Sequence, residues 1–151
     1  MSQKTLLIYL VDDDQEDRML FREALDEIEI PVQVHEFDNG VTLIDTLLNP
    51  NHALPDAIYL DMNMPLMNGE ECIDDIRSEN LFSQIPIIIY STYVDEHMLD
   101  RLQKKGANWY LIKPDSFEKL KKLLLKSLEF IQSDSEVKNE SSHEDFLITI
   151  T

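Results

Sequence analysis

Acidic side chains follow directly after two short apolar runs of this sequence. Asp12 and Asp13 come after Thr5 to Val11, and Asp61 comes after Ala57 to Leu60. Continuous apolar runs of this length are typical of strands that are covered on both faces of a parallel sheet. The carboxyl ends of parallel strands meet at one edge of the sheet, where ligands bind in open α/β folds. We therefore expect these three carboxylates to lie close together.

Two other polar side chains, Ser91 and Lys113, also follow apolar runs. Ser91 closes the run Ile87 to Tyr90, and Lys113 follows Asn108 to Ile112. Taken singly, each of the five polar residues has a simpler explanation, such as an acid at a helix N-terminus, a hydroxyl at a strand end or a solvated loop charge. Taken together, an acid cluster that faces a hydroxyl and an ammonium has the parts needed to hold Mg²⁺ and to transfer a phosphoryl group. A carboxylate can be the nucleophile in such a transfer and form an acyl phosphate.

The segments between these runs have the 3.6-residue periodicity of amphipathic helices. In the first of them, apolar residues recur near helical spacing at Met19, Leu20, Ala24, Leu25 and Ile28. Five strands are predicted, at residues 5–11, 32–37, 57–60, 87–90 and 108–112. Five helices alternate with them, at residues 15–28, 41–48, 70–79, 95–105 and 116–131. This alternation predicts an α/β fold with right-handed crossovers and a parallel sheet that has helices on both faces.

Length and charge restrict the class of protein. The 151 residues fit one domain of ordinary size, and 30 acidic against 13 basic residues give a formal net charge of -17. Such a charge opposes binding to a phosphate backbone, so nucleic acid is not an expected partner. No basic segment followed by an apolar core opens the chain, and no apolar run approaches about 18 residues, which predicts neither export nor membrane insertion.

Cysteine and histidine usage argues against two other kinds of site. Cys72 is the only cysteine, so no internal disulfide can form, and a reducing cytoplasm is the simplest compartment. The histidines are scattered without the spacing of metal ligands, at His35, His52, His97 and His143. This distribution supports neither a zinc site nor an internal phosphohistidine.

The composition changes after the last predicted helix. We predict a folded domain at residues 1–132 and an acidic, flexible tail at residues 133–151. From Ser133 to about Asp145 the residues are too polar to bury a core. Phe146 to Ile150, with the sequence FLITI, is the exception. Its apolar and β-branched residues could add an edge strand, dock on a partner or promote crystal contacts.

Four pieces of the sequence resemble the receiver domains of two-component response regulators, in particular single-domain receivers of the chemotaxis type. The pieces are VDDD at Val11 to Asp14, LDMNMPLMNG at Leu60 to Gly69, PIIIYST at Pro86 to Thr92, and GANWYLIKP at Gly106 to Pro114. The resemblance covers Lys4 to about Gln132. It implies a flavodoxin-like (βα)5 fold, a doubly wound parallel sheet of five strands in the order 2-1-3-4-5.

The resemblance also implies roles for individual residues. Asp12 and Asp13 would bind Mg²⁺, and Asp61 would be phosphorylated and would also contact the metal. The other implied roles are a metal-binding backbone carbonyl at Asn63, a switch hydroxyl at Ser91, a switch aromatic ring at Tyr110 and a phosphate-binding amine at Lys113. A cis peptide bond between Lys113 and Pro114 is implied as well.

The implied activity is Mg²⁺-dependent transfer of a phosphoryl group to Asp61 from phosphohistidine on a histidine kinase or a histidine phosphotransfer protein. The chain would be no enzyme beyond its own phosphorylation and dephosphorylation. Ser91 would move toward the phosphoryl group, and Tyr110 would turn inward into the vacated space. This shift would reshape the face made by the fourth helix, the fifth strand and the fifth helix. The output would be a protein contact or onward phosphotransfer, and the downstream target and homodimer formation stay open.

Two rival functions share parts of this pattern. A haloacid-dehalogenase-like phosphatase also uses an aspartate nucleophile and Mg²⁺, but it usually carries a second aspartate two residues later, where this chain has Asn63. A phosphorylation-independent binding module on the same scaffold would not need the intact set of site residues. Thr92 stands where receivers often have a smaller Ala or Gly, which predicts slower loss of phosphate from Asp61.

Overall fold

The computed structural model describes residues 4–133 and 146–150, in which five strands alternate with five α-helices. The strands are β1 (Leu6–Val11), β2 (Val32–Phe37), β3 (Ala57–Leu60), β4 (Ile87–Ser91) and β5 (Trp109–Ile112). The helices are α1 (Gln15–Asp26), α2 (Gly40–Leu48), α3 (Gly69–Arg77), α4 (Glu96–Lys105) and α5 (Phe117–Ser133). All strand pairs are parallel, in the order β2-β1-β3-β4-β5, which confirms the predicted flavodoxin-like fold.

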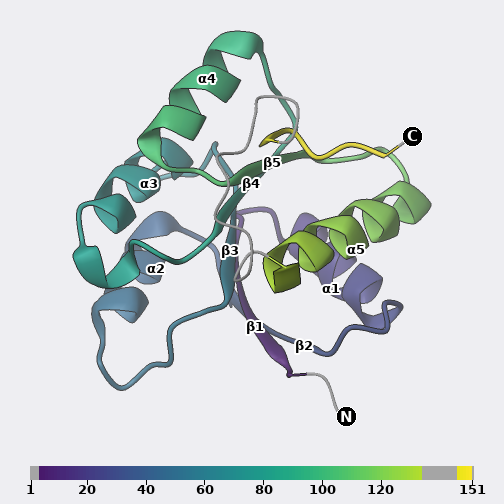
Figure 1. Cartoon of the computed structure of the whole chain (residues 1–151), viewed down its shortest axis with the longest axis horizontal. Helices are drawn as coiled ribbons and strands as arrows, with labels where there is room; N and C mark the ends of the chain where they lie inside the picture. The colour runs from purple at the N-terminus through teal and green to yellow at the C-terminus, as the bar shows by residue number, and fades with distance from the viewer. Residues whose placement is uncertain (1–3, 134–145, 151) are drawn as a thin grey trace.

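The sheet lies between two layers of helices. Figure 1 shows α1 and α5 on one face and α2, α3 and α4 on the other. β3 supplies both layers of the core, because Ala57 and Tyr59 face α1 and α5 whereas Ile58 and Leu60 face the opposite helices. All four residues of β3 are buried, so its sequence is apolar throughout instead of alternating. A rigid central strand therefore ends at Asp61.

Side-chain caps mark where the helices begin. Each of the first four α-helices starts after a residue whose side chain accepts a hydrogen bond from the first turn, namely Asp14, Asn39, Asn68 and Asp95. Asp14 matters for the site, because it starts α1 directly after the acidic pair that ends β1. Gly106 forms the C-terminal cap of α4, and its φ of 116° lies in the left-handed region.

Two local predictions in the helical layers need correction. The apolar face of α1 is made by Phe21, Ala24 and Leu25, whereas Met19 and Leu20 are 52% and 41% exposed. Near-helical spacing is compatible with stripes rotated by one residue, and only packing against the sheet and α5 selects the stripe centred on Phe21. The short 3-10 helix Asn80–Phe82 was also not predicted, and it buries Phe82.

The peptide bond between Lys113 and Pro114 is trans, contrary to the cis bond that the resemblance implied. No cis peptide bond occurs among the described residues. An X-Pro bond prefers the trans form by about 0.5–1 kcal/mol unless the surrounding structure reverses that preference. With the bond in trans, the Lys113 ammonium reaches the acids at the strand ends, at 2.7 Å from Asp12.

The end of the chain lies beside β5, as Figure 1 shows. Leu147 forms an isolated parallel bridge with Tyr110. Of the three alternatives for FLITI, the structure shows a short addition to the sheet edge. Residues 134–145, most of the predicted flexible tail, lie outside the described residues, and the division at residue 132 stays a prediction. Within the described ranges, no helix has the length and apolar character that crossing a membrane requires.

Candidate functional site

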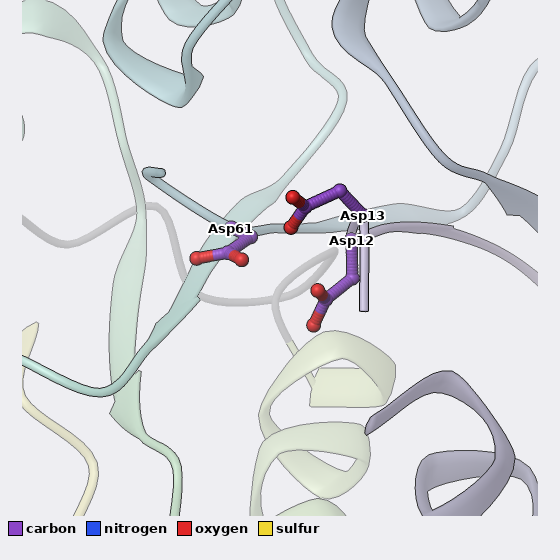
Figure 2. Close-up of side chains that lie close together, drawn as sticks. All are labelled: Asp12, Asp13 and Asp61. Carbon is purple, nitrogen blue, oxygen red and sulfur yellow. The ribbon is translucent and has the colours of Figure 1, made fainter. Parts of the chain in front are cut away.

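Three carboxylates meet at the carboxyl edge of the sheet (Figure 2). The register of β1 and β3 pairs Val11 with Leu60, so the residues that follow these strands, Asp12 and Asp61, stand side by side. The Asp61 N–H donates to the Val11 carbonyl at 2.9 Å, which continues the ladder to the site. One carboxylate oxygen from each of Asp12, Asp13 and Asp61 lies within 4.8 Å of the others. The predicted convergence of these acids is therefore present in the structure.

The three acids differ in their exposure to water. Asp12 is fully buried and Asp61 is 6% exposed, whereas Asp13 is exposed. Burial raises the pKa of the Asp12 carboxyl to about 6, although Lys113 and the Asp14 N–H act in the opposite direction. A buried acid with a raised pKa is a group that gains from a nearby cation. A positive charge bound near these three acids would therefore stabilise the cluster.

Lys113 supplies part of that positive charge. Its Nζ lies 2.7 Å from Asp12, 2.8 Å from Asp17 and 3.4 Å from Asp61. Burial alone lowers the pKa of this ammonium, but its contacts with Asp12 and Asp17 outweigh burial, so the pKa is raised. The Lys113 N–H also donates to the Ser91 carbonyl at 2.8 Å, which fixes the backbone from which the side chain reaches the acids.

Asp17 is a member of this cluster that the sequence analysis missed. It lies in the first turn of α1, and the cap at Asp14 turns that helix back across the strand ends. The signal was present, since acidic residues in the first turn of a helix that follows a strand point toward the same edge of the sheet. In the sequence analysis, an acid at a helix N-terminus is considered only as a simpler explanation for the acids that follow the apolar runs.

Ser91 ends β4 next to the acids and is almost completely buried. Among the described residues its hydroxyl makes no hydrogen bond of good geometry, although it lies near enough to the Tyr110 hydroxyl to lower the pKa of that tyrosine. Leaving a buried hydroxyl unpaired costs about 1–3 kcal/mol. An unpaired hydroxyl beside Asp61 is suited to a ligand with acceptor oxygens, such as a phosphoryl group. Thr92, the residue that follows, is exposed.

Tyr110 and Asn63 complete the predicted set. The Tyr110 side chain is fully buried, and its hydroxyl donates to the carbonyl of Tyr93. Burial raises the pKa of Tyr110 to about 12, the nearby Ser91 side chain acts in the opposite direction, and the negative charges of Asp61 and Asp95 add to the effect of burial. Asn63 is exposed, and its backbone N–H points to Asp61 at 3.4 Å. The predicted metal contact of its carbonyl stays a prediction.

The donor set fits a hard divalent cation. Mg²⁺ prefers oxygen ligands at about 2.0–2.1 Å, so ligand oxygens on opposite sides of the ion lie about 4 Å apart. The three carboxylate oxygens, within 4.8 Å of one another, come near this spacing. Mg²⁺ usually keeps several waters, and exposed Asp13 leaves one side open to them. Asp12, Asp13 and Asp61 are therefore the residues that would hold the ion.

Comparisons with known proteins agree with this geometry. The chain matches the response regulator receiver domain family over residues 8–125. Chemotaxis protein CheY1 of Helicobacter pylori is 30% identical over 117 residues, which are 78% of this chain and 92% of that protein. Sensor histidine kinase CheAY of Helicobacter pylori is 29% identical over 128 residues, which are 85% of this chain but 16% of that protein.

Solved structures are similar as well. The phosphorylated cyanobacterial phytochrome response regulator RcpA is 26% identical, with a TM-score of 0.79, over 90% of this chain and 100% of that one. Its fold therefore matches the described part of this chain from β1 to α5. Together with the family match, which spans most of the chain, these similarities establish that the chain belongs to the response regulator receiver domain family.

Proposed function

We propose that this receiver accepts a phosphoryl group on Asp61 from phosphohistidine on a histidine kinase or a histidine phosphotransfer protein, in a Mg²⁺-dependent reaction in the cytoplasm. It signals onward through a protein contact or a second phosphotransfer, and it has no turnover beyond its own phosphorylation and dephosphorylation. The observation that carries this proposal is the position of Asp61, which has a carboxylate oxygen within 4.8 Å of oxygens of Asp12 and Asp13 and whose Oδ2 lies 3.4 Å from the Lys113 ammonium.

In the proposed reaction a carboxylate oxygen of Asp61 attacks the phosphorus atom. The new O–P bond gives an acyl phosphate, and the P–N bond of phosphohistidine breaks with its electron pair going to the imidazole nitrogen, which takes up a proton. Asp12, Asp13 and Asp61 would hold Mg²⁺, which would supply neutralisation of the negative charge that develops in the transfer. Lys113 adds a compact positive charge, because its Nζ can leave Asp17 for a phosphoryl oxygen. Ser91, whose hydroxyl makes no hydrogen bond of good geometry among the described residues, donates it to a second oxygen.

Two of the similar proteins support the choice of partner and product. CheAY is a sensor histidine kinase, and RcpA has been solved in a phosphorylated form. Acceptance of phosphate by this chain from such a kinase is part of the proposal. The net charge of -17 supports a protein partner with a cationic surface over nucleic acid.

The test is incubation with acetyl phosphate, with Mg²⁺ or with a chelator, followed by intact mass measurement. We expect a single added phosphoryl group that requires Mg²⁺ and is absent in Asp61→Asn. A matched control is Asp75→Asn, which alters an exposed acid of α3 and should be phosphorylated like the wild type. Phosphorylation of the Asp61→Asn chain, or equal phosphorylation in the chelator, would overturn the proposal.

A further inference from the structure

The outer edge of β5 is occupied by the chain's own residues 146–150. β5 is the last strand in the sheet order, so this edge would otherwise present unpaired backbone groups. The Ile148 N–H donates to the Tyr110 carbonyl at 2.9 Å, and Leu147 pairs with Tyr110 in a parallel bridge. Lys126 of α5 donates to the Thr149 carbonyl. The segment thus adds to the sheet as a bound peptide does in strand addition.

Side-chain burial shows that residues 146–150 occupy a specific site at the β5 edge, which is the seat of this segment. Phe146 is fully buried and Ile148 is 3% exposed, whereas Thr149 between Ile148 and Ile150 is exposed. Phe146 joins the core layer of α2, α3 and α4, and Ile148 joins the layer of α1 and α5. Burial of side chains of this size contributes about 1.5–3 kcal/mol each. The edge therefore has defined sites for an extended apolar segment.

Phe146 also contacts a residue that reaches toward the acidic site. Its ring lies 6.4 Å from the Tyr110 ring, centroid to centroid, in an edge-on arrangement at 64°. Both rings are fully buried and packed together, so movement of the Tyr110 ring toward Phe146 requires the displacement of Phe146. At the other end of the ring, the negative charge of Asp61 acts on the Tyr110 hydroxyl. Tyr110 is therefore in physical contact with the seated segment and within the electrostatic field of Asp61.

We propose that residues 146–150 are an intramolecular peptide ligand of the β5 edge, and that their seating and the occupancy of the Asp61 site favour each other through Tyr110. The link is Ser91, which is buried at the end of β4 and interacts through its side chain with the Tyr110 hydroxyl. When Ser91 moves toward an anionic group on Asp61, it leaves space next to Tyr110. An inward position of the Tyr110 ring fills that space, and the packing of Phe146 against the ring favours the same inward position. The coupling rests on the proposed function, whereas the seat stands without it.

Hydrogen exchange at the Ile148 amide tests the seat in the full-length chain. We expect this amide to be protected in the wild type to the same degree at all protein concentrations. Phe146→Ala should lower the protection at least about tenfold, while the amides of β1 and β3 stay protected and show that the chain is folded. Thr149→Ala, which changes an exposed side chain of the same segment, should leave the protection of the Ile148 amide unchanged. An unprotected Ile148 amide in the wild type would overturn the seat, and protection that rises with concentration would assign it to a second copy.

Trifluoroberyllate with Mg²⁺, a phosphoryl analogue that is not transferred, tests the coupling. We expect it to raise Ile148 protection in the wild type by about fivefold or more, and to leave Asp61→Asn unchanged. By reciprocity, Phe146→Ala should bind the analogue more weakly by the same factor. Phe82→Ala, which removes a ring of equal burial in the same core layer, should bind it like the wild type.

The outcomes separate the two proposals. Binding of the analogue to the wild type without a change at Ile148 would overturn the coupling and leave the proposed function intact. Failure of the wild type to bind the analogue or to accept phosphate would contradict the proposed function and the coupling together. The exchange data without analogue would still decide whether the β5 edge holds residues 146–150.

Discussion

Lys113 satisfies three carboxylates at once in the described structure. Its ammonium lies closest to Asp12 and Asp17, and farther from Asp61. Partnering by these acids raises the pKa of Lys113, so the side chain stays positive throughout the physiological range. A phosphoryl group on Asp61 would add negative charge on the side where the present contact is longest. The residue is therefore placed to change partners with little movement of its backbone.

The buried charge of Asp12 predicts an effect of pH on stability. Its pKa is about 6 in the folded chain, above the ordinary value of an aspartate, so the folded state binds the proton more tightly than the unfolded state does. Without Mg²⁺, stability from this residue should rise as the pH falls from about 6 toward about 4, and the ionised carboxyl should be destabilising above pH 6. Asp12→Asn is expected to stabilise the metal-free chain at pH 7 by about 1–3 kcal/mol.

Urea unfolding in a chelator, at pH 7 and at pH 4, checks this expectation. The increase in the free energy of unfolding caused by Asp12→Asn should be present at pH 7. It should be small at pH 4, where the wild-type carboxyl is protonated in the folded state. Asp13→Asn, which alters the exposed neighbour, should change stability by less than about 0.5 kcal/mol at either pH. Destabilisation by Asp12→Asn at pH 7 would show that the ion pair with Lys113 outweighs the cost of burial.

Thr92 predicts a long lifetime of the phosphorylated form. It is exposed and directly follows Ser91, the last residue of β4, at the same carboxyl edge of the sheet as Asp61. A smaller residue would admit water more freely to the acyl phosphate. We expect Thr92→Ala to lose phosphate several-fold faster than the wild type, as followed by intact mass after removal of acetyl phosphate. Equal or slower loss in the variant would exclude this role.

At the level of the elements, Gly106 joins α4 to β5 in a conformation that other residues adopt poorly. Its φ is 116°, and a Cβ there would lie 2.8 Å from Cγ of Arg77. The Arg77 guanidinium is tied to the carbonyls of Gly106 and Phe82 at 3.0 and 2.9 Å. The side chain of Arg77 therefore cannot retreat without losing hydrogen bonds that join α3 to the start of β5.

Gly106→Ala should consequently destabilise the chain by about 1–3 kcal/mol, since it combines backbone strain with the displacement of Arg77. The measurement is the free energy of unfolding in urea. Lys104→Ala in the last turn of the same helix is the control, because it removes only an exposed pair with Asp100 and should cost less than about 1 kcal/mol. Equal losses in the two variants would contradict the account of Gly106.

For the whole molecule, the acidic cluster and the high negative charge predict stabilisation by Mg²⁺. A cation that binds only the folded chain stabilises it by about 1.4 kcal/mol for each tenfold increase in concentration above its dissociation constant. Screening of a net charge of -17 would also stabilise the fold, without any specific site. The two effects differ in their dependence on individual acids.

Thermal unfolding with MgCl2 or with NaCl at equal ionic strength distinguishes them. We expect MgCl2 to raise the unfolding temperature of the wild type more than NaCl does. This additional increase should be absent in Asp13→Asn and Asp61→Asn. Asp75→Asn, which alters an exposed residue of α3, should show the same additional increase with MgCl2 as the wild type. An excess that persists in all three variants would indicate general binding to the acidic surface.

Much of the fold and of the site follows from local features of the sequence. Buried parallel strands must be apolar along their length, so their ends are visible wherever a polar residue interrupts the run, as at Asp12, Asp61 and Ser91. Turn and cap residues such as Asp14 and Gly106 define where helices begin and end. Since parallel strands deliver their carboxyl ends to one edge, these local features suffice to predict that the acids, the hydroxyl and the amine converge.

Only the tertiary structure decided how these parts touch. The rotation of α1, the contact of Asp17 with Lys113 and the position of residues 146–150 on β5 depend on residues far apart in the chain. Periodicity and composition do not predict such contacts, because each contact depends on packing against surfaces that exist only after folding. The sequence by itself determined which groups meet at the strand ends, whereas three-dimensional packing determined which acid holds Lys113 and what covers Tyr110.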